Sequence, residues 1–407
     1  MHDKKHSTRE KIVRELYFNN SLSCADLSLK IKKSLPVTTR IVSELIDDGW
    51  IREMGFAPST GGRRPGMYSL KSDVSFIVCV AMDQFVVRIA VMDMQNNMVS
   101  TPGKFELSLP KNQGALTQLT EIITGYLKEA RLPKKKLLGI GIGMPGFVDY
   151  KNGINYSFLE TTTGTVTEHI SRVTGLPVFI DNDSSLIALA ELRFGAAKNK
   201  NNAMVINLGW GLGLGMILNA ELFRGHDGFA GEFSHIPVFS NDKMCSCGKS
   251  GCLETETSLL VIIDQAKRVL ELGRSSMTDI SFTEDHEEAW TAISRAVHAG
   301  DRFIIELFSK VGYNIGRGVA ILIHLLNPEL IILSGRGSVA GKVWLAPIQQ
   351  ALNEHCIPRI AANTSLVMST LGHDAELVGA AALVMENFQH KQTDKNNNKE
   401  IAIKSSY

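Results

Sequence analysis

The sequence contains no long hydrophobic run, few cysteines and almost no net charge. No stretch reaches the roughly 18 apolar residues that a membrane span requires, and no apolar segment follows the charged residues 1–11, so we expect a cytoplasmic protein with no membrane contact. Six cysteines in 407 residues are too few for a disulfide framework. A chain of this length exceeds the size at which one hydrophobic core stops growing, which predicts two or three domains.

The net charge of +1 hides an uneven distribution of charged residues. Residues 1–70 contain 12 Lys or Arg and 8 Asp or Glu, a net charge of +4, which leaves −3 for the rest of the chain. A basic region attached to a slightly acidic body favours nucleic-acid binding at the basic end.

Residues 1–72 are predicted to form a winged helix-turn-helix. A capping box at Ser7–Glu10 opens a helix of about 12 residues. A second cap at Ser23 precedes another helix, and a third helix follows Ser34–Pro36 and runs to Gly49. Three short helices in this order are typical of a helix-turn-helix, although they also fit a three-helix interaction module.

The third helix is the expected recognition helix. Val37, Ile41 and Leu45 recur with helical spacing and are predicted to be buried. Short hydroxyl side chains and one Arg remain for the outer face, where they can contact phosphates and base edges in the major groove. The candidate DNA-binding residues of this helix are Thr38, Thr39, Arg40 and Ser43.

A wing is predicted after the third helix. Trp50–Met54 and Met67–Leu70 can pair as the strands of a hairpin. Between them, Ser59–Pro65 carries Arg63 and Arg64 on a glycine-rich loop that can approach a phosphate backbone or a narrow minor groove. The alternative is a solvated charged loop.

From about Phe76 the pattern becomes that of an α/β domain. A helix is expected over Leu116–Ala130, among runs rich in β-branched residues. The predicted strands are Phe76–Ala81, Phe85–Asp93, a run ending near Leu107, Leu137–Gly146 and Val178–Asp183. Open α/β sheets bind ligands at the carboxyl ends of their strands, so the polar end of the last run is a candidate binding edge.

A second cycle of the same kind begins at Ala203. The run Ala203–Leu208 enters a glycine turn at Gly209–Gly215, and Met216–Leu218 is predicted to be a strand. Glycines spaced by two residues are weak evidence alone, because packed strands also use them for close approach. Repetition of strands, glycine turns and helices nevertheless predicts two similar lobes with a cleft between them. A long helical segment is expected over Phe303–Leu326.

A compact group of metal-binding side chains follows the second glycine turn. Three of the six cysteines have the spacing Cys-x-Cys-x4-Cys, at Cys245, Cys247 and Cys252, and His235 lies ten residues before the first of them. One imidazole and three thiolates make a closed tetrahedral set for Zn²⁺, with no position left for substrate, so the zinc is predicted to be structural. The alternative is three unrelated buried cysteines.

Several motifs together match those of one family. They are Gly139–Asp149, the glycine run from Leu208, the His–Cys cluster with Leu253 and Glu254 after it, Gly-Gly-Arg-Arg-Pro in the wing, and Asn327–Glu329 with Leu333–Gly335. In these motifs nearly the whole chain resembles the ROK family of repressors, open reading frames and sugar kinases, with a wing typical of its repressor branch. The resemblance implies an α/β actin-like, hexokinase-like duplicated-lobe fold, a homodimer or homotetramer, and a sugar or sugar phosphate in the interlobe cleft.

The resemblance also implies domain limits. Residues 73–198 would form the first lobe, with 371–388 returning to it, because the small-residue helix Ala375–Val384 packs there in the family. Residues 199–370 would form the second lobe with the zinc loop. The polar residues 389–407 are expected to be a disordered tail.

The family's sugar-binding residues have counterparts in this chain. Asn182 and Asp183 match a sugar-binding Asn and a catalytic Asp, which in a kinase would take the proton from a sugar hydroxyl. Glu232, His235 and Glu254 match groups that hold sugar hydroxyls, with His235 between ligand and zinc. Without the resemblance, Asn182 and Asp183 could equally be a helix cap.

Two departures from the family argue against phosphoryl transfer. Family kinases carry Asp-x-Gly-Gly-Thr in the first hairpin to hold the ATP phosphates, whereas Ala81–Phe85 reads Ala-Met-Asp-Gln-Phe. The usual Gly-Thr-Gly of the second phosphate loop has Trp210 in its centre. Phosphoryl transfer depends on positioning and charge stabilisation, so loss of both loops should abolish it even though Asp183 is present.

These observations favour a regulator rather than an enzyme. We hypothesise a DNA-binding repressor of carbohydrate-utilisation genes, whose partners are operator DNA and a sugar or sugar-phosphate effector. The alternatives are an ATP-dependent sugar kinase with an appended DNA-binding head, and a regulator controlled by a partner protein.

Overall fold

The computed structural model describes residues 7–58, 64–161, 163–272 and 285–388. It divides into two compact units. The first, here called the N-terminal unit, contains Met1–Ser75 with Asp93–Gln95 and Met385–Tyr407. The second, here called the body, contains Phe76–Met92 and Asn96–Val384.

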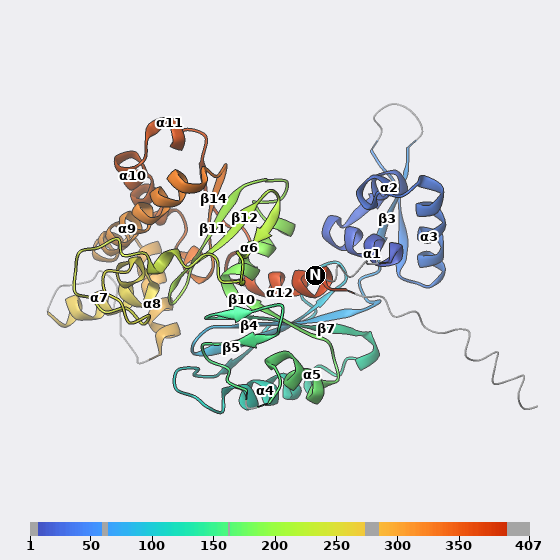
Figure 1. The fold of residues 1–407 in the computed structure, drawn as a ribbon, viewed down its shortest axis with the longest axis horizontal. Coiled ribbons are helices and arrows are strands. Elements are labelled where there is room, and N and C mark those ends of the chain that lie inside the picture. Colours follow the sequence, from blue (N-terminus) through green and yellow to red (C-terminus); the bar gives the residue numbers. More distant parts are fainter. Residues whose placement is uncertain (1–6, 59–63, 162, 273–284, 389–407) are drawn as a thin grey trace, which may run out of the picture. The chain divides into compact units, whose positions relative to one another are not determined.

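The N-terminal unit combines three helices with a three-stranded sheet (Figure 1). The helices are α1 (Thr8–Asn19), α2 (Cys24–Ile31) and α3 (Leu35–Asp47), and the strands are β1 (Ser21–Ser23), β2 (Ile51–Phe56) and β3 (Gly66–Leu70). The sheet has the order β1-β3-β2 with antiparallel pairing. The capping box predicted at Ser7 and the cap predicted at Ser23 both form, the latter also as a capping box, and they fix where α1 and α2 begin. The short strand β1 was not predicted.

The phase of α3 differs from the prediction. Thr38, predicted to face outward, is fully buried, and its Oγ1 donates to the Ser34 carbonyl oxygen at 3.1 Å. Val37, predicted to be buried, is 37% exposed. Thr38 lies three positions before Ile41 and seven before Leu45, so it shares their buried face, and Val37 lies beside that face. The prediction that Thr38 faces outward, where it could contact DNA, is therefore wrong.

The first sheet of the body has the order β10-β7-β4-β5-β6. Its strands are β4 (Phe76–Met82), β5 (Val86–Asp93), β6 (Gly103–Glu106), β7 (Leu137–Met144) and β10 (Val178–Asn182). β4, β7 and β10 are parallel, and β6 pairs antiparallel with β5. The helices α4 (Ala115–Ala130) and α5 (Val166–Thr174) lie along one face, and the small hairpin of β8 (Val148–Asp149) and β9 (Ile154–Asn155) follows β7 (Figure 1). We call this part the first lobe.

The second sheet repeats this plan, with the order β13-β12-β11-β14-β15. Its strands are β11 (Ala203–Leu208), β12 (Leu212–Leu218), β13 (Glu221–Phe223), β14 (Leu330–Ser334) and β15 (Ser365–Met368). Two antiparallel pairs form one side and two parallel pairs the other. The helices are α7 (Leu259–Glu271), α8 (His286–His298), α9 (Arg302–Leu326), α10 (Leu345–His355) and α11 (Pro358–Ala361). This part is the second lobe, and its match to the first confirms the duplicated architecture.

Two helices, α6 (Asp183–Phe194) and α12 (Ala375–Glu386), pack closely against the strands. Side chains alternate along β7, so Ile140 joins the core beneath α4 while Gly141 faces α12. A Cβ at Gly141 would overlap the Ala380 carbonyl, and one at Gly215 of β12 would overlap Ala188 of α6. Glycine at these positions lets α12 approach the first sheet and α6 approach the second.

Within the described ranges, no helix is both long enough and apolar enough to cross a bilayer.

Candidate functional site

The body contains a cavity of about 610 Å³ lined by strand ends and loops of both lobes. Small-molecule sites typically have volumes of roughly 300–1,000 Å³. The five predicted sugar-binding residues all line this cavity; they are Asn182, Asp183, Glu232, His235 and Glu254. The chain therefore brings together carboxylates, an amide and an imidazole, which can donate to and accept from the hydroxyls of a polyol.

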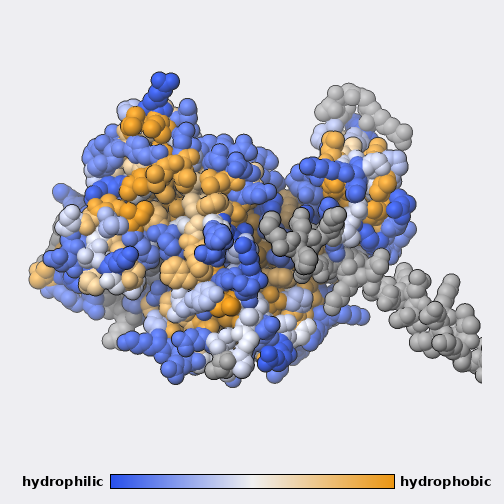
Figure 2. All heavy atoms as spheres, in the orientation of Figure 1, coloured by the Kyte–Doolittle hydropathy of each residue, from blue (hydrophilic) through white to orange (hydrophobic). Residues whose placement is uncertain are grey.

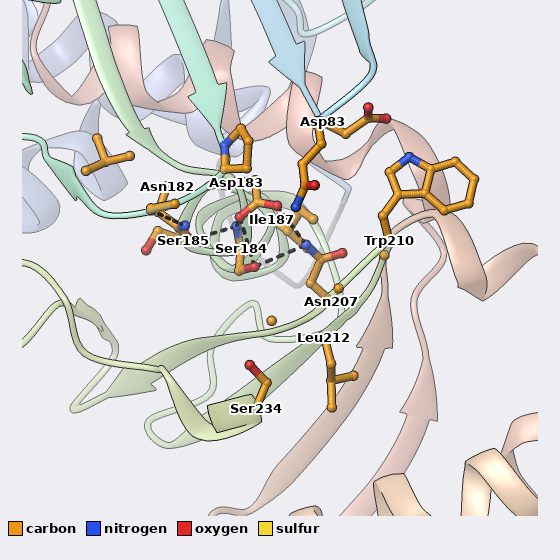
Figure 3. Close-up of a pocket in the computed structure, with 18 of the residues that line it drawn as sticks. Asp83, Asn182, Asp183, Ser184, Ser185, Ile187, Asn207, Trp210, Leu212 and Ser234 are labelled. Atoms are coloured by element: carbon orange, nitrogen blue, oxygen red, sulfur yellow. Dashed lines mark hydrogen bonds between the residues drawn. The ribbon is translucent and has the colours of Figure 1, made fainter. Parts of the chain in front are cut away.

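The junction of β10 and α6 places Asn182 and Asp183 at the cavity (Figure 3). Asn182 is the N-cap of α6, because its Oδ1 accepts from the backbone N–H groups of Ser184 (3.0 Å) and Ser185 (3.3 Å). Its Nδ2 donates to the Gly146 carbonyl oxygen at 3.2 Å. The pair thus caps a helix and also lines the cavity, so the two explanations that the sequence left open are compatible.

Burial and hydrogen bonds have opposite effects on the pKa of Asp183. Its Oδ1 accepts from the backbone N–H of Ser184 at 2.7 Å, and its Oδ2 accepts from Nδ2 of Asn207 at 3.3 Å. Desolvation in the cleft raises the pKa of Asp183 to about 6, against the opposing effect of the Ser184 hydrogen bonds. A carboxyl group with a pKa near neutrality can both bind and release a proton under physiological conditions.

A second buried carboxyl group lies near Asp183. Oε1 of Glu376, in the first turn of α12, accepts from the backbone N–H of Met82 at 3.2 Å. Burial raises the pKa of Glu376 to about 8, and the charge of Asp183 adds to the shift. Glu376 is therefore largely protonated at neutral pH.

Glu232, His235 and Glu254 lie where the cavity meets the cysteine cluster. Nε2 of His235 lies 3.6 Å from Oε2 of Glu232, while its Nδ1 lies 3.4 Å from Sγ of Cys245. Glu254 Oε2 accepts from the backbone N–H of Leu212 at 3.4 Å. His235 thus faces the cavity with one ring nitrogen and the thiols with the other.

The four predicted metal ligands form one cluster. The ligand atoms of His235, Cys245, Cys247 and Cys252 all lie within 4.8 Å of one another. Sγ of Cys247 and Sγ of Cys252 are 3.6 Å apart. Zinc bonds of about 2.0–2.3 Å place the corners of a tetrahedron roughly 3.4–3.8 Å apart. The Cys247–Cys252 and His235–Cys245 pairs have this spacing, whereas the upper limit of 4.8 Å for the whole set exceeds it. The cluster could therefore hold a metal ion.

Side chains fill the region of the two altered loops. The guanidinium carbon of Arg336 lies 4.5 Å from the centre of the Trp210 ring. Phe85, from the hairpin of the first lobe, packs against Trp210 at 6.3 Å and against His286 at 4.8 Å between ring centroids. Arg336 also reaches Asp83 of the same hairpin, with 2.5 Å between Nη2 and Oδ2. Figure 3 shows Asp83 and Trp210 at this end of the pocket.

A second carboxylate completes this ion-pair group. Nη1 of Arg336 is bonded to Oε1 of Glu287, at the start of α8. The Arg336 side chain is 8% exposed, while those of Asp83 and Glu287 are 22% and 21% exposed. Asp83 comes from the first lobe and the other two from the second, so this group, which we call the Arg336 cluster, connects the lobes.

Most of the described candidate DNA-binding residues of the N-terminal unit are exposed. Thr39, Arg40 and Ser43 are exposed on α3, as predicted. Nη1 of Arg40 pairs with Oε1 of Glu44 at 2.7 Å. In the wing, Arg64 is exposed, whereas Arg63 lies outside the described residues. Contact of these residues with DNA stays a prediction.

Asn207, Arg336 and Glu376 are among the cavity-lining residues that were not identified from the sequence. Asn207 is a polar residue inside the otherwise apolar strand β11, beside the glycine turn, and that signal could have found it. Arg336 and Glu376 carry no such local signal, because an Arg after a turn and a Glu in a first helical turn are both common on surfaces.

The N-terminal unit is a winged helix-turn-helix, and residues 5–52 match the winged helix-turn-helix DNA-binding family. The body has the actin-like fold of sugar kinases, duplicated as two lobes. Residues 78–387 match the ROK family, so the chain belongs to the ROK family.

Relatives of two kinds resemble the chain. A xylose repressor of Caldicellulosiruptor bescii is 27% identical over 92% of this chain and 94% of the relative. A glucokinase of Halalkalibacterium halodurans is 31% identical over 73% of this chain and 91% of the relative. Among solved structures, a ROK family transcriptional regulator described as a homologue of the Escherichia coli MLC protein is 26% identical, with a TM-score of 0.73 over 93% of this chain and 96% of the other.

Proposed function

We propose that the chain is a sugar-responsive transcriptional repressor of carbohydrate-utilisation genes. Its N-terminal unit binds operator DNA, and a sugar or sugar phosphate binds in the cleft of the body. The observation that carries this proposal is the presence of a winged helix-turn-helix and a cavity lined by polyol-binding groups in one chain. The similarity to a xylose repressor over almost the whole length supports it.

An ATP-dependent sugar kinase with an appended DNA-binding head is the second candidate. Asp183 favours it, because a carboxyl group with a pKa near 6 suits a general base. The two altered loops argue against it: Asp83, Phe85 and Trp210 put charge and bulk where kinases of the family have glycines and hydroxyls. We therefore propose that the chain is not an enzyme and that Asp183 binds a sugar hydroxyl without removing its proton.

The wild-type protein is expected to phosphorylate no sugar with ATP, while the sugar that it binds changes its operator affinity by roughly 5- to 150-fold, as is usual for allosteric coupling. Asp183→Asn keeps the shape of the side chain but removes the base, so it should only shift the sugar concentration needed for the DNA response. A coupled assay for ADP release and a gel-shift titration measure the two properties. Phosphorylation by the wild type that disappears in Asp183→Asn would establish the kinase.

DNA binding has its own test in the wing. Arg63→Ala/Arg64→Ala should weaken binding to all sequences alike and reduce the slope of log K against log salt by about 2, because each phosphate contact contributes roughly 0.9. Thr39→Ala should instead change which operator is preferred. Arg302→Ala, at an arginine 89% exposed in the body, is the control and should change neither property. An unchanged salt slope in the wing variant would refute the wing assignment.

We also propose that the His–Cys cluster holds a structural zinc ion. His235, Cys245, Cys247 and Cys252 would be its four ligands, which leaves no open position for a substrate. The zinc would fix the loop that presents Glu232 and His235 to the cavity.

A homodimer or homotetramer is the proposed assembly. Leu325 and Ile357 are 71% and 55% exposed, and they are neighbours because the backbone N–H of Ile357 donates to Nε2 of His324. Figure 2 shows apolar side chains at the surface around α9 to α11. Exposed apolar patches of this kind are typical of protein interaction sites.

A further inference from the structure

The charges around the cavity favour a ligand without a phosphate. The described residues that line it include two arginines, Arg88 and Arg336, and five acids, of which Glu376 is largely protonated at neutral pH; the other four are Asp83, Asp183, Glu232 and Glu254. Three of the acids, Asp183, Glu232 and Glu254, have no arginine partner among the ion pairs of the described residues. A dianionic phosphate would meet these carboxylates in a site of low dielectric, where repulsion between like charges is strong.

Both arginines of the cavity are already engaged. Arg336 is bonded to Asp83 and Glu287 in the Arg336 cluster. Nη1 of Arg88 pairs with Oδ1 of Asp374 at 3.1 Å, and its Nη2 donates to the His373 carbonyl oxygen at 2.7 Å. The imidazole of His373 supplies no charge, because burial and the nearby arginines lower its pKa to about 2. A phosphate would have to share these guanidinium groups with the carboxylates that already neutralise them.

Backbone N–H groups that commonly bind phosphate are also occupied. Helix N-termini and glycine-rich loops bind anions through such groups. At the start of α6 they donate to Asn182, at the second glycine turn Leu212 donates to Glu254, and in the first hairpin Met82 donates to Glu376. The chain's own oxygen atoms thus take the places of phosphate oxygens.

An aromatic surface lies at the edge of the same cavity. Phe147 and Phe229 line it, with ring centroids 5.6 Å apart, and Tyr156 packs edge-on against Phe229 at 6.0 Å. Phe147 is 45% and Tyr156 is 60% exposed, although aromatic side chains are usually mostly buried. We call these three residues the aromatic platform.

Contacts of Arg224 fix the position of the aromatic platform. The guanidinium of Arg224 lies 4.5 Å above the ring of Tyr150, in the β8–β9 hairpin that leads to Tyr156. Nη2 of Arg224 also pairs with Oδ2 of the buried Asp181 at 2.7 Å. Arg224 thereby fixes the loop that carries Phe229 next to the hairpin, so the exposed rings form a built surface.

We propose that the ligand of this cavity is an uncharged glycoside or disaccharide, with one sugar ring among the cleft carboxylates and its second ring or aglycone on the aromatic platform. The inference rests on the proposed function, because it names the chemical class of the effector. It excludes sugar phosphates as effectors, whereas the proposed function by itself allows either a sugar or a sugar phosphate.

Paired ligands test the charge of the effector. The full-length protein is titrated by calorimetry with the methyl and phenyl glycosides of glucose, xylose, galactose and N-acetylglucosamine, with cellobiose, maltose and lactose, and with the 6-phosphates of the three hexoses. We expect binding of at least one neutral glycoside and of none of the phosphates. The inference would be overturned if a sugar phosphate bound more tightly than its neutral partner, or if no neutral glycoside bound. The proposed function fails separately, if a glycoside binds and operator affinity does not change.

Single substitutions test the aromatic platform. Phe147→Ala and Phe229→Ala should each weaken phenyl-glycoside binding by roughly three- to tenfold, as expected for loss of one aromatic contact, and leave the methyl glycoside of the same sugar unchanged. Phe223→Ala is the matched control, because Phe223 is 44% exposed but does not line the cavity. Equal losses for phenyl and methyl glycosides, or no loss at all, would show that the rings do not contact the ligand.

Discussion

Cys247→Ser/Cys252→Ser is expected to reduce the zinc content from about one ion per chain to none and to unfold the loop between His235 and Glu254. A structural zinc site contributes directly to folding, by roughly 10–16 kcal/mol in small peptides, so this is the largest effect that we expect. The sugar response should also weaken, because His235 connects the cluster to Glu232 in the cavity. Metal analysis by mass spectrometry and limited proteolysis of the loop measure the outcome.

Cys356→Ser provides a control for loss of a thiol. Cys356 is a buried free cysteine of the second lobe that does not belong to the cluster. This variant should keep its zinc and its sugar response. Full zinc content in the double variant would place the metal at other residues.

Arg336→Ala is expected to lower the free energy of unfolding of the body by about 3 kcal/mol, since removal of one member of a buried ion pair typically costs roughly 3–5 kcal/mol. We choose the lower end because Asp83 and Glu287 are about one-fifth exposed and retain some hydration. The loss should appear as a lower urea midpoint by tryptophan fluorescence, which reports on Trp210, Trp290 and Trp344 of the body.

A matched substitution separates this effect from loss of a surface arginine. Arg302 also pairs with a carboxylate, Glu306, at 3.1 Å, but it is 89% exposed. Arg302→Ala should cost less than about 0.5 kcal/mol, as exposed helical pairs do. Adding Asp83→Asn to Arg336→Ala should recover part of the stability, because Asp83 would otherwise keep an uncompensated charge, whereas Glu287 still has Lys104 at 3.9 Å. Equal effects of Arg336→Ala and Arg302→Ala would show that the Arg336 cluster contributes no stability beyond a surface pair.

Features encoded in a few consecutive residues could be predicted from the sequence. The capping box at Ser7, the strand Ala203–Leu208 and the thiol spacing from Cys245 to Cys252 are local patterns, and the structure contains each element where it was expected. The prediction for Thr38 failed because it followed the polarity of the side chain. Its spacing from Ile41 and Leu45 places it on the buried face, and its hydroxyl is satisfied there by the Ser34 carbonyl oxygen.

Features that depend on distant residues could not be predicted. Arg336 and Asp83 are 253 positions apart, and Glu376 and Met82 are 294 apart. No local pattern of charge or hydrophobicity indicates such a pair, because its partners meet only when the two lobes are folded. The helices α8 and α10 were missed as well, although both have an apolar face that packs in the core of the second lobe.

The N-cap role of Asn182 affects which ligand groups the cleft can distinguish. Its Oδ1 accepts two backbone hydrogen bonds and one hydrogen of its Nδ2 is given to Gly146, so a single N–H remains for a ligand. At the ionised carboxylate of Asp183, by contrast, a ligand atom must donate. A ligand oxygen between the two must therefore accept on one side and donate on the other. A hydroxyl group does both, whereas an ether oxygen or a fluorine atom cannot donate, so the cleft distinguishes a free hydroxyl from a substituted one by the direction of its hydrogen bonds.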